Sequence, residues 1–162
     1  MSFTQKDRQI VRDLARHVME IASLPVQDEK RAMWTKHNRL EKVRPMVWIN
    51  EIPWGELQNE ELECQTENLF CRGAESNLRT TLYLWNHMRT DMVVEPVFYS
   101  SVVYHDTGHG VDVKAVKGKG GECGFGADDY IPIMETEADI ESIQIPTITA
   151  DWEATERNYQ MT

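Results

Sequence analysis

A chain of 162 residues has room for one ordinary domain with its own core, and a hydrophobic content of 41% argues against disorder. Its 27 acidic and 17 basic side chains give a net charge of -10, which disfavours nucleic acid and anionic membranes as partners because both require a positive face. Three cysteines (Cys64, Cys71 and Cys123) suggest no disulfide framework, and we expect no signal peptide and no membrane span, because the first residues carry no apolar stretch behind a basic start and no apolar run has membrane length. We therefore predict a cytoplasmic protein.

The first part of the chain is predicted to form two helices. Thr4 can cap the first helix, and Asp7 completes a weak capping box. Pro25 is predicted to end this helix, and Asp28 is predicted to begin a second one that ends before Pro45. Apolar side chains recur along the first helix at three- and four-residue steps, at Ile10, Leu14, Val18 and Ile21.

The middle of the chain is predicted to form a βαβ unit. A continuous apolar run at 46–49 lies between two prolines, and a second apolar run follows at 91–99. Such runs are typical of strands buried on both faces. Between them, a helix is predicted to begin near Thr66 or Asn68 and to keep its apolar step as far as Met88. The order strand, helix, strand implies a parallel pair with a right-handed crossover.

Polar side chains accompany the ends of both predicted strands. Asn50 and Glu51 follow the first apolar run, and Glu95 lies in the second. Ligands of α/β folds bind at the carboxyl ends of parallel strands, so we predict that these three side chains face one site, with Trp54 and Tyr99 as walls. The alternative is that a carboxylate at a strand end only caps a helix or pairs with an arginine.

The last part of the chain is predicted to begin with a β-hairpin. Residues 100–104 and 111–115 are β-like, and residues 105–110 form the turn between them. A glycine-rich loop at 118–126 is predicted to be mobile. Three further elements are expected: a short strand at 130–134, a helix capped by Thr136 and Asp139, and a last helix beginning at Trp152.

No cluster in the sequence predicts a metal or phosphate site. His105 and His109 are four residues apart, but glycines flank His109 and favour a turn over a metal-binding helix. Cys64 and Cys71 are seven residues apart, which matches no common zinc spacing. The glycine-rich loop lacks the Ser or Thr that follows Gly-Lys in a phosphate-binding loop.

The order of these elements resembles the N-terminal part of the uroporphyrinogen decarboxylase superfamily, which includes the cobalamin-dependent methyltransferases. The resemblance implies a TIM barrel, often dimeric. Five segments carry it, in this order: Arg-Pro-Met-Val-Trp at 44–48, Arg-Thr-Thr-Leu-Tyr at 79–83, Asp-Met-Val-Val-Glu-Pro at 91–96, Gly-Lys-Gly at 118–120 and Met-Glu-Thr-Glu-Ala-Asp-Ile at 134–140.

Two departures from the family pattern favour its methyltransferase branch. The decarboxylases carry an arginine-rich segment after the first strand, whereas residues 49–54 contain no arginine. They also carry an aspartate just after the second strand, and no aspartate occurs here between Asp91 and Asp106. The resemblance therefore implies a corrinoid cofactor and a corrinoid protein as partner. It implies zinc only with the later part of the barrel, for which this chain has no matching segment.

These observations predict an α/β chain that forms the N-terminal part of a TIM (β/α)8 barrel, because 162 residues fall short of the roughly 200–250 that a barrel needs. Residues 1–162 would be one partial domain. Its parts would be leading helices at 1–45, a first βαβ unit at 46–99, and a hairpin insertion with following helices at 100–162. The resemblance implies that the chain is the N-terminal portion of a uroporphyrinogen decarboxylase-like protein, of the corrinoid-dependent methyltransferase type rather than a porphyrinogen decarboxylase. The alternative is a non-catalytic binding or structural subunit. Either would exist as a homo-oligomer or with a partner chain that completes the barrel.

Overall fold

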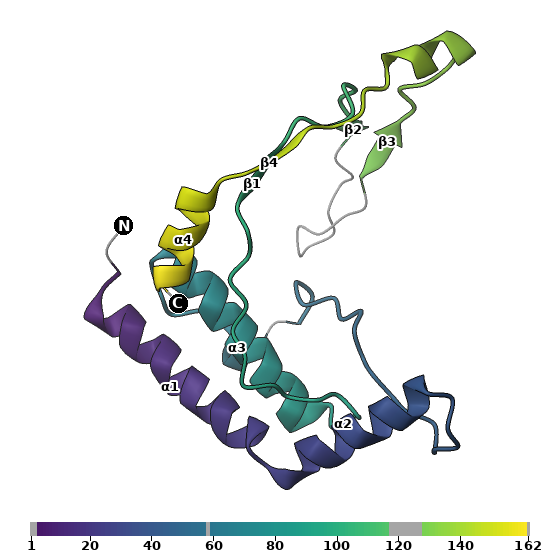
Figure 1. Ribbon diagram of the computed structural model, residues 1–162. Coiled ribbons are helices and arrows are strands. Elements are labelled where there is room, and N and C mark those ends of the chain that lie inside the picture. The colour runs from purple at the N-terminus through teal and green to yellow at the C-terminus, as the bar shows by residue number, and fades with distance from the viewer. Residues whose placement is uncertain (1–2, 58, 117–127, 162) are drawn as a thin grey trace. The chain divides into compact units, whose positions relative to one another are not determined.

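The computed structural model describes residues 3–57, 59–116 and 128–161, and the chain divides into two units, residues 1–97 and 98–162. The first contains α1, α2 and α3, drawn in purple, blue and teal in Figure 1. The predicted glycine-rich loop at 118–126, including Cys123, lies outside the described residues.

Helix α1 (Gln5–Ala22) begins as predicted. The Thr4 hydroxyl accepts a hydrogen bond from the backbone N–H of Asp7, and the Asp7 carboxylate accepts one from the backbone N–H of Thr4. This reciprocal pair satisfies two of the free donors at the helix start. The carboxylate of Asp7 also accepts the backbone N–H of Glu67, at 3.1 Å. A single local motif therefore also ties the start of α1 to the chain that precedes α3.

Helix α2 (Pro25–Asn38) starts three residues earlier than predicted. Pro25 was expected only to end the first helix, but it occupies the first turn of the second one. Proline fits there because the first N–H groups of a helix have no intrahelical partner and its φ is already helical. After Arg39, Leu40 takes a positive φ of 59°, and the helical path ends there.

Helix α3 (Leu69–His87) confirms the predicted third helix. The side chain of Asn68 caps it by accepting hydrogen bonds from the backbone N–H groups of Phe70 and Cys71. The preceding loop carries a short 3₁₀ helix, η1 (Glu60–Leu62). Helix α1 packs along α3, and the buried core of the unit consists of Val18, Ala22, Leu78 and Val94.

The predicted parallel strands are absent, so the barrel prediction is wrong. Residues 46–49 form no strand, and Val47 and Trp48 are 52% and 65% exposed rather than buried. Residues 91–94 are also irregular, although Val94 is buried. The two segments meet at one backbone hydrogen bond, from Asp91 N–H to the carbonyl of Val47, at 2.9 Å. A single bond does not make a ladder.

The side chains of α2 explain why residues 91–94 need no strand beside them. The Trp34 indole N–H donates to the Asp91 carbonyl at 2.8 Å, and the Lys30 ammonium donates to the Met92 carbonyl at 3.1 Å. The Gln27 side-chain oxygen accepts the Val94 N–H at 3.0 Å. Backbone groups removed from water must be paired, and here helix side chains provide partners that a neighbouring strand would otherwise supply.

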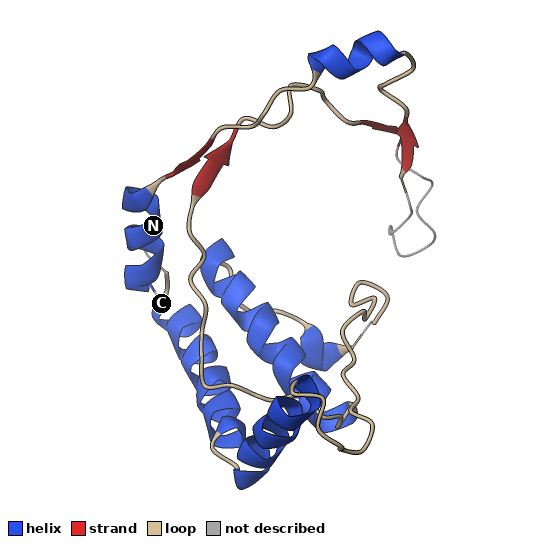
Figure 2. Cartoon of the chain, turned by 45° about the vertical axis from the view of Figure 1, so that its right-hand side comes forward, coloured by secondary structure: helices blue, strands red, loops and turns tan. Residues whose placement is uncertain are grey.

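The second unit has two small antiparallel sheets in place of the predicted hairpin. Strand β1 (Tyr104–Asp106) pairs with β4 (Ile148–Ala150), and β2 (Lys114–Val116) pairs with β3 (Asp129–Ile131). Figure 2 shows these short strands in red. Of the two predicted strands at 100–104 and 111–115, only residues 104 and 114–115 lie in ladders, and they pair with later segments rather than with each other. The fold as described is helix-rich, with mixed α and β elements and no closed barrel.

Two predicted helix starts in the second unit are confirmed. Asp139 and Thr136 form the expected capping box, but the helix that follows is the 3₁₀ helix η2 (Glu137–Ser142). Helix α4 (Trp152–Met161) begins at the predicted residue, and the Asp151 carboxylate accepts the backbone N–H of Ala154 at 2.8 Å.

Acid should weaken the first unit through Asp91. The bidentate hydrogen bond from Arg44, followed by the backbone N–H of Val47, lowers the pKa of Asp91 from 3.8 to about 2. Because the pKa is depressed in the folded state, the stabilisation is complete above the unfolded pKa and is lost as the pH falls through the folded pKa. We expect the difference in unfolding free energy between the native chain and Asp91→Asn to shrink from about pH 5 to pH 2.

Urea unfolding at a series of pH values measures this difference. Asp28→Asn is the matched control, because Asp28 forms only an exposed pair with Arg31 in the same unit and such pairs contribute little. A difference for Asp91→Asn that stays constant down to pH 2 would contradict the assignment.

Candidate interaction surface

The five predicted site residues lie in different surroundings in the structure. Asn50 and Glu51 are exposed and share a hydrogen bond of 3.4 Å, and Trp54 packs edge-on against Tyr83 with ring centroids 6.1 Å apart. Glu95 is exposed in the first unit, whereas Tyr99 is exposed in the second. The strand ends that were expected to bring them together are absent. A common site for these residues stays a prediction.

The second unit carries its apolar side chains on its surface. None of its described residues is buried, and the described strands expose nearly every position. A two-stranded antiparallel pair is only marginally stable by itself in water. The exposed large apolar side chains are Phe98, Tyr99, Val102, Tyr104, Val113, Val116, Tyr130, Ile131, Met134, Ile140, Ile143, Ile145, Ile148, Trp152 and Tyr159.

The strand register gathers some of these side chains on one face. In the β1–β4 pair, Tyr104 lies opposite Ala150 and Asp106 lies opposite Ile148. Alternate residues of a strand share a face, so Tyr104 and Ile148 are diagonal neighbours on the same side. Both are more than 60% exposed. We call the exposed apolar side chains of residues 98–159 the apolar surface of the second unit.

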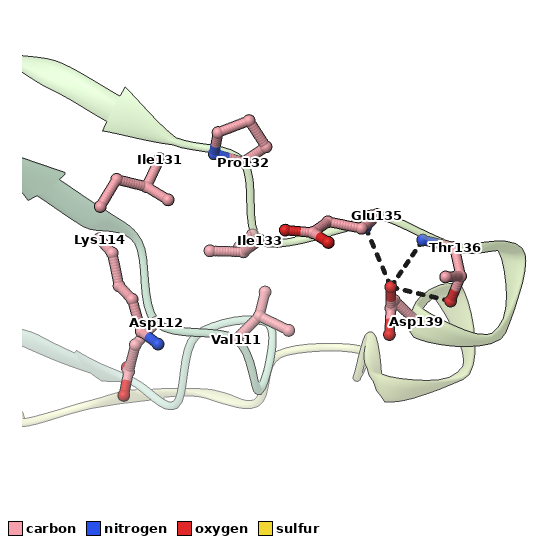
Figure 3. A pocket seen from close by; sticks show the side chains of 9 residues that line it. All are labelled: Val111, Asp112, Lys114, Ile131, Pro132, Ile133, Glu135, Thr136 and Asp139. Atoms are coloured by element: carbon pink, nitrogen blue, oxygen red, sulfur yellow. Dashed lines mark hydrogen bonds between the residues drawn. The ribbon is translucent and has the colours of Figure 1, made fainter.

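An acidic cavity of about 690 Å³ lies beside β2 and β3, and Figure 3 shows its lining. The apolar part of the lining is formed by Val111, Ile131 and Ile133, with Pro132. Among the described residues, its charged groups are the carboxylates of Asp112, Glu135 and Asp139 and the ammonium of Lys114. Carboxylates beside apolar walls suit the side chain of a lysine or arginine, whose stem is apolar and whose head is positive.

Asp139 has a structural role in this cavity. One of its oxygens accepts hydrogen bonds from the backbone N–H groups of Thr136 (2.7 Å) and Glu135 (3.0 Å) and from the Thr136 hydroxyl (3.0 Å). The bond from the Thr136 backbone is the largest cause that lowers the pKa of Asp139. Glu135 differs, because Figure 3 shows its carboxylate directed toward Ile133 and away from the capping contacts. The carboxylate of Glu135 therefore takes no part in the cap.

The negative charge of the chain is concentrated in the second unit. Residues 98–162 carry 12 acidic and 4 basic side chains, a net charge of -8, and residues 1–97 carry 15 acidic and 13 basic side chains, a net charge of -2. The total charge of -10 does not show this difference between the two parts. The sequence signal for this surface is the charge of each part, together with the isoleucines that lie among the carboxylates of residues 128–148.

Among the residues that the structure describes, no three His, Cys, Asp or Glu side chains are grouped so that they could hold a metal ion. Within the same ranges, no helix is long and apolar enough to cross a membrane. Searches against protein-family models, curated proteins and solved structures give no match to this chain.

Proposed function

We propose that this chain is a binding subunit whose second unit docks on a partner protein. The observation that carries the proposal is the apolar surface of the second unit together with the lack of any buried residue among those described there, because a partner would give these side chains the cover that the unit itself does not. This proposal corresponds to the non-catalytic subunit that the sequence suggested as an alternative.

The charge of the second unit favours a different, basic partner over a second copy of the same unit. Two second units in contact would bring net charges of -8 against each other, which opposes association. A partner with lysine or arginine around an apolar patch would match both the carboxylates and the apolar side chains. The carboxylate of Glu135 and the walls of the acidic cavity provide one such contact.

Site-specific crosslinking tests the proposal with a close control. Ile145 and Leu40 are almost equally exposed, at 95% and 94%, but only Ile145 belongs to the second unit. A photo-crosslinking amino acid at Ile145 is expected to capture one basic protein in the cells that make this chain, and the same group at Leu40 is not. With that protein purified, Ile145→Ser should weaken binding by roughly tenfold, and Leu40→Ser should have little effect.

Two results would contradict the proposal. One is a crosslink from Ile145 only to another copy of this chain, which would make the surface a homo-oligomer interface. The other is equal capture from Ile145 and Leu40. Binding to the purified partner should also weaken as salt is raised, because the expected contact brings opposite charges together.

The resemblance to the uroporphyrinogen decarboxylase superfamily supports a second proposal, a methyltransferase that acts with a corrinoid and a corrinoid protein. It rests on the segments at 44–48, 79–83 and 91–96. The chain is incubated with a corrinoid and a methyl donor, alone and with the crosslinked partner. Turnover by the chain alone would favour the methyltransferase and would contradict a non-catalytic subunit.

A further inference from the structure

A second cavity, of about 640 Å³, lies in the first unit and has the opposite charge. Its volume falls within the range of small-molecule sites. Helix α2 contributes two of its lining residues, α3 contributes one, and the irregular segments around residues 44–47 and 89–91 contribute the rest. The lining consists of Val26, Lys30, Arg44, Val47, Trp85, Arg89, Thr90 and Asp91.

Among the described residues that line this cavity, Asp91 is the only carboxylate, and it is already paired with Arg44. Asp91 accepts two hydrogen bonds from the Arg44 guanidinium and one from the backbone N–H of Val47, at 2.8 Å. Arg44 and Asp91 therefore neutralise each other. Lys30 and Arg89 remain, and within the described residues neither has a carboxylate in direct contact: Lys30 donates to the Met92 carbonyl, and Arg89 to the Trp85 carbonyl at 3.3 Å.

Trp85 holds these two positive groups at the cavity wall. The Lys30 ammonium lies 5.1 Å from a Trp85 ring centroid, and the Arg89 guanidinium carbon lies 5.4 Å from one. Both distances are within the reach of cation–π attraction. Lys30 is only 9% exposed, and burial lowers its pKa, an effect that Asp91 opposes and Arg89 increases. Because Arg44 shares the charge of Asp91, a further anion near Lys30 and Arg89 would offset part of the cost of burying the Lys30 ammonium.

We propose that this cavity binds a small organic phosphate monoester between Lys30 and Arg89. A phosphate monoester carries nearly two negative charges at neutral pH and three acceptor oxygens, so it matches two cations better than a single carboxylate does. Arginine presents a planar fork of donors to such oxygens, and lysine adds a point charge. The organic part of the ligand packs against Trp85, Val26 and Val47.

This site is independent of the proposed docking function, because it lies wholly in residues 1–97 and needs no partner protein. The acidic cavity of the second unit serves as an internal contrast, since its three carboxylates repel phosphate. Failure of phosphate binding would leave the docking proposal untouched, and failure of docking would leave this one untouched.

Calorimetry with phenyl phosphate, inorganic phosphate, benzoate and phenol tests the site on the full chain. Phenyl phosphate is expected to bind most tightly, because only it combines a dianion with a flat apolar group. Arg89→Gln is the main variant, since Arg89 is exposed and the change should preserve folding. It is expected to weaken phenyl phosphate binding by roughly tenfold. Arg12→Gln is the control, because it removes the same charge from an exposed position on α1.

Each possible result of these titrations either supports or overturns the phosphate site. Weaker binding in Arg89→Gln but not in Arg12→Gln, together with a preference for phenyl phosphate over benzoate, supports the site. Equal losses in the two variants would mean that only overall charge matters and would overturn it. Absence of phenyl phosphate binding at millimolar concentration would overturn it as well. Trp85→Leu should reduce the advantage of phenyl phosphate over inorganic phosphate.

Discussion

Glu75→Ala is expected to destabilise the first unit by about 3–5 kcal/mol, which is the typical cost of removing one partner of a buried ion pair. Glu75 is completely buried in α3. Its carboxylate accepts the backbone N–H groups of Gln65 (2.9 Å) and Thr66 (2.8 Å) and the Nε–H of Arg79 (2.7 Å). Removal of the carboxylate leaves all three donors without this partner. Urea unfolding of the native and variant chains measures the effect.

The pKa of Glu75 reflects the same contacts. Burial raises the pKa, but the hydrogen bonds from Gln65, Arg79 and Thr66 together lower it below the ordinary value. The charged form is therefore the one that the fold stabilises. Glu75→Gln keeps the size of the side chain and loses its charge, and it should lie between the native chain and Glu75→Ala in stability.

Glu61→Ala is the matched control for Glu75. Glu61 pairs with His87, which is also on α3, at 3.1 Å, but both side chains are exposed. Exposed pairs of this kind contribute about 1 kcal/mol or less. If Glu75→Ala and Glu61→Ala lower the unfolding free energy equally, the buried carboxylate does not hold residues 65–66 to α3 as described.

Local sequence signals were enough to predict the starts of several helices. A helix cap contacts backbone groups only a few residues away, so it can be predicted without knowledge of the fold. Three caps show this: Thr4 with Asp7, Asn68 alone, and Thr136 with Asp139. The start of α2 was missed because proline both ends one helix and suits the first turn of the next.

The strands were predicted wrongly because pairing depends on distant residues. The apolar runs at 46–49 and 91–94 look like buried strands, but side chains of α2 bind the backbone of the second run. In the second unit, β1 and β2 pair with segments that follow the glycine-rich loop in the sequence. Nothing local to either run shows which partner will satisfy its backbone groups.

The residues that line the cavity of the first unit were missed for a related reason. Arg44, Arg89 and Asp91 flank the apolar runs in the sequence, where they resemble ordinary polar boundaries of a strand. Only the fold shows that Arg44 and Asp91 pair with each other, which leaves Lys30 and Arg89 beside Trp85. The sequence shows which residues are charged, but only tertiary contacts decide which of these charges are neutralised by a partner and which can bind a ligand.

Gln27→Ala is expected to destabilise the first unit by about 2–4 kcal/mol. Gln27 is completely buried; its amide oxygen accepts the Val94 N–H, and its amide nitrogen donates to the Ile21 carbonyl at 3.2 Å. A buried N–H left without a partner costs about 1–3 kcal/mol, and the loss of buried apolar groups of the side chain adds roughly 1 kcal/mol. Urea unfolding measures the total.

Two further variants separate the causes. Gln27→Met keeps most of the buried volume but removes both hydrogen bonds, so it should retain the larger part of the loss. Gln9→Ala is the control, because Gln9 is an exposed glutamine whose side-chain amide donates hydrogen bonds to the Asp13 carboxylate on the surface of α1. If residues 91–94 paired with a neighbouring strand, the Val94 N–H would keep a partner and Gln27→Met would cost little. A loss in Gln27→Met no larger than in Gln9→Ala would therefore argue against the fold described for this segment. A clear loss would show that α2 side chains, rather than a sheet, hold it in place.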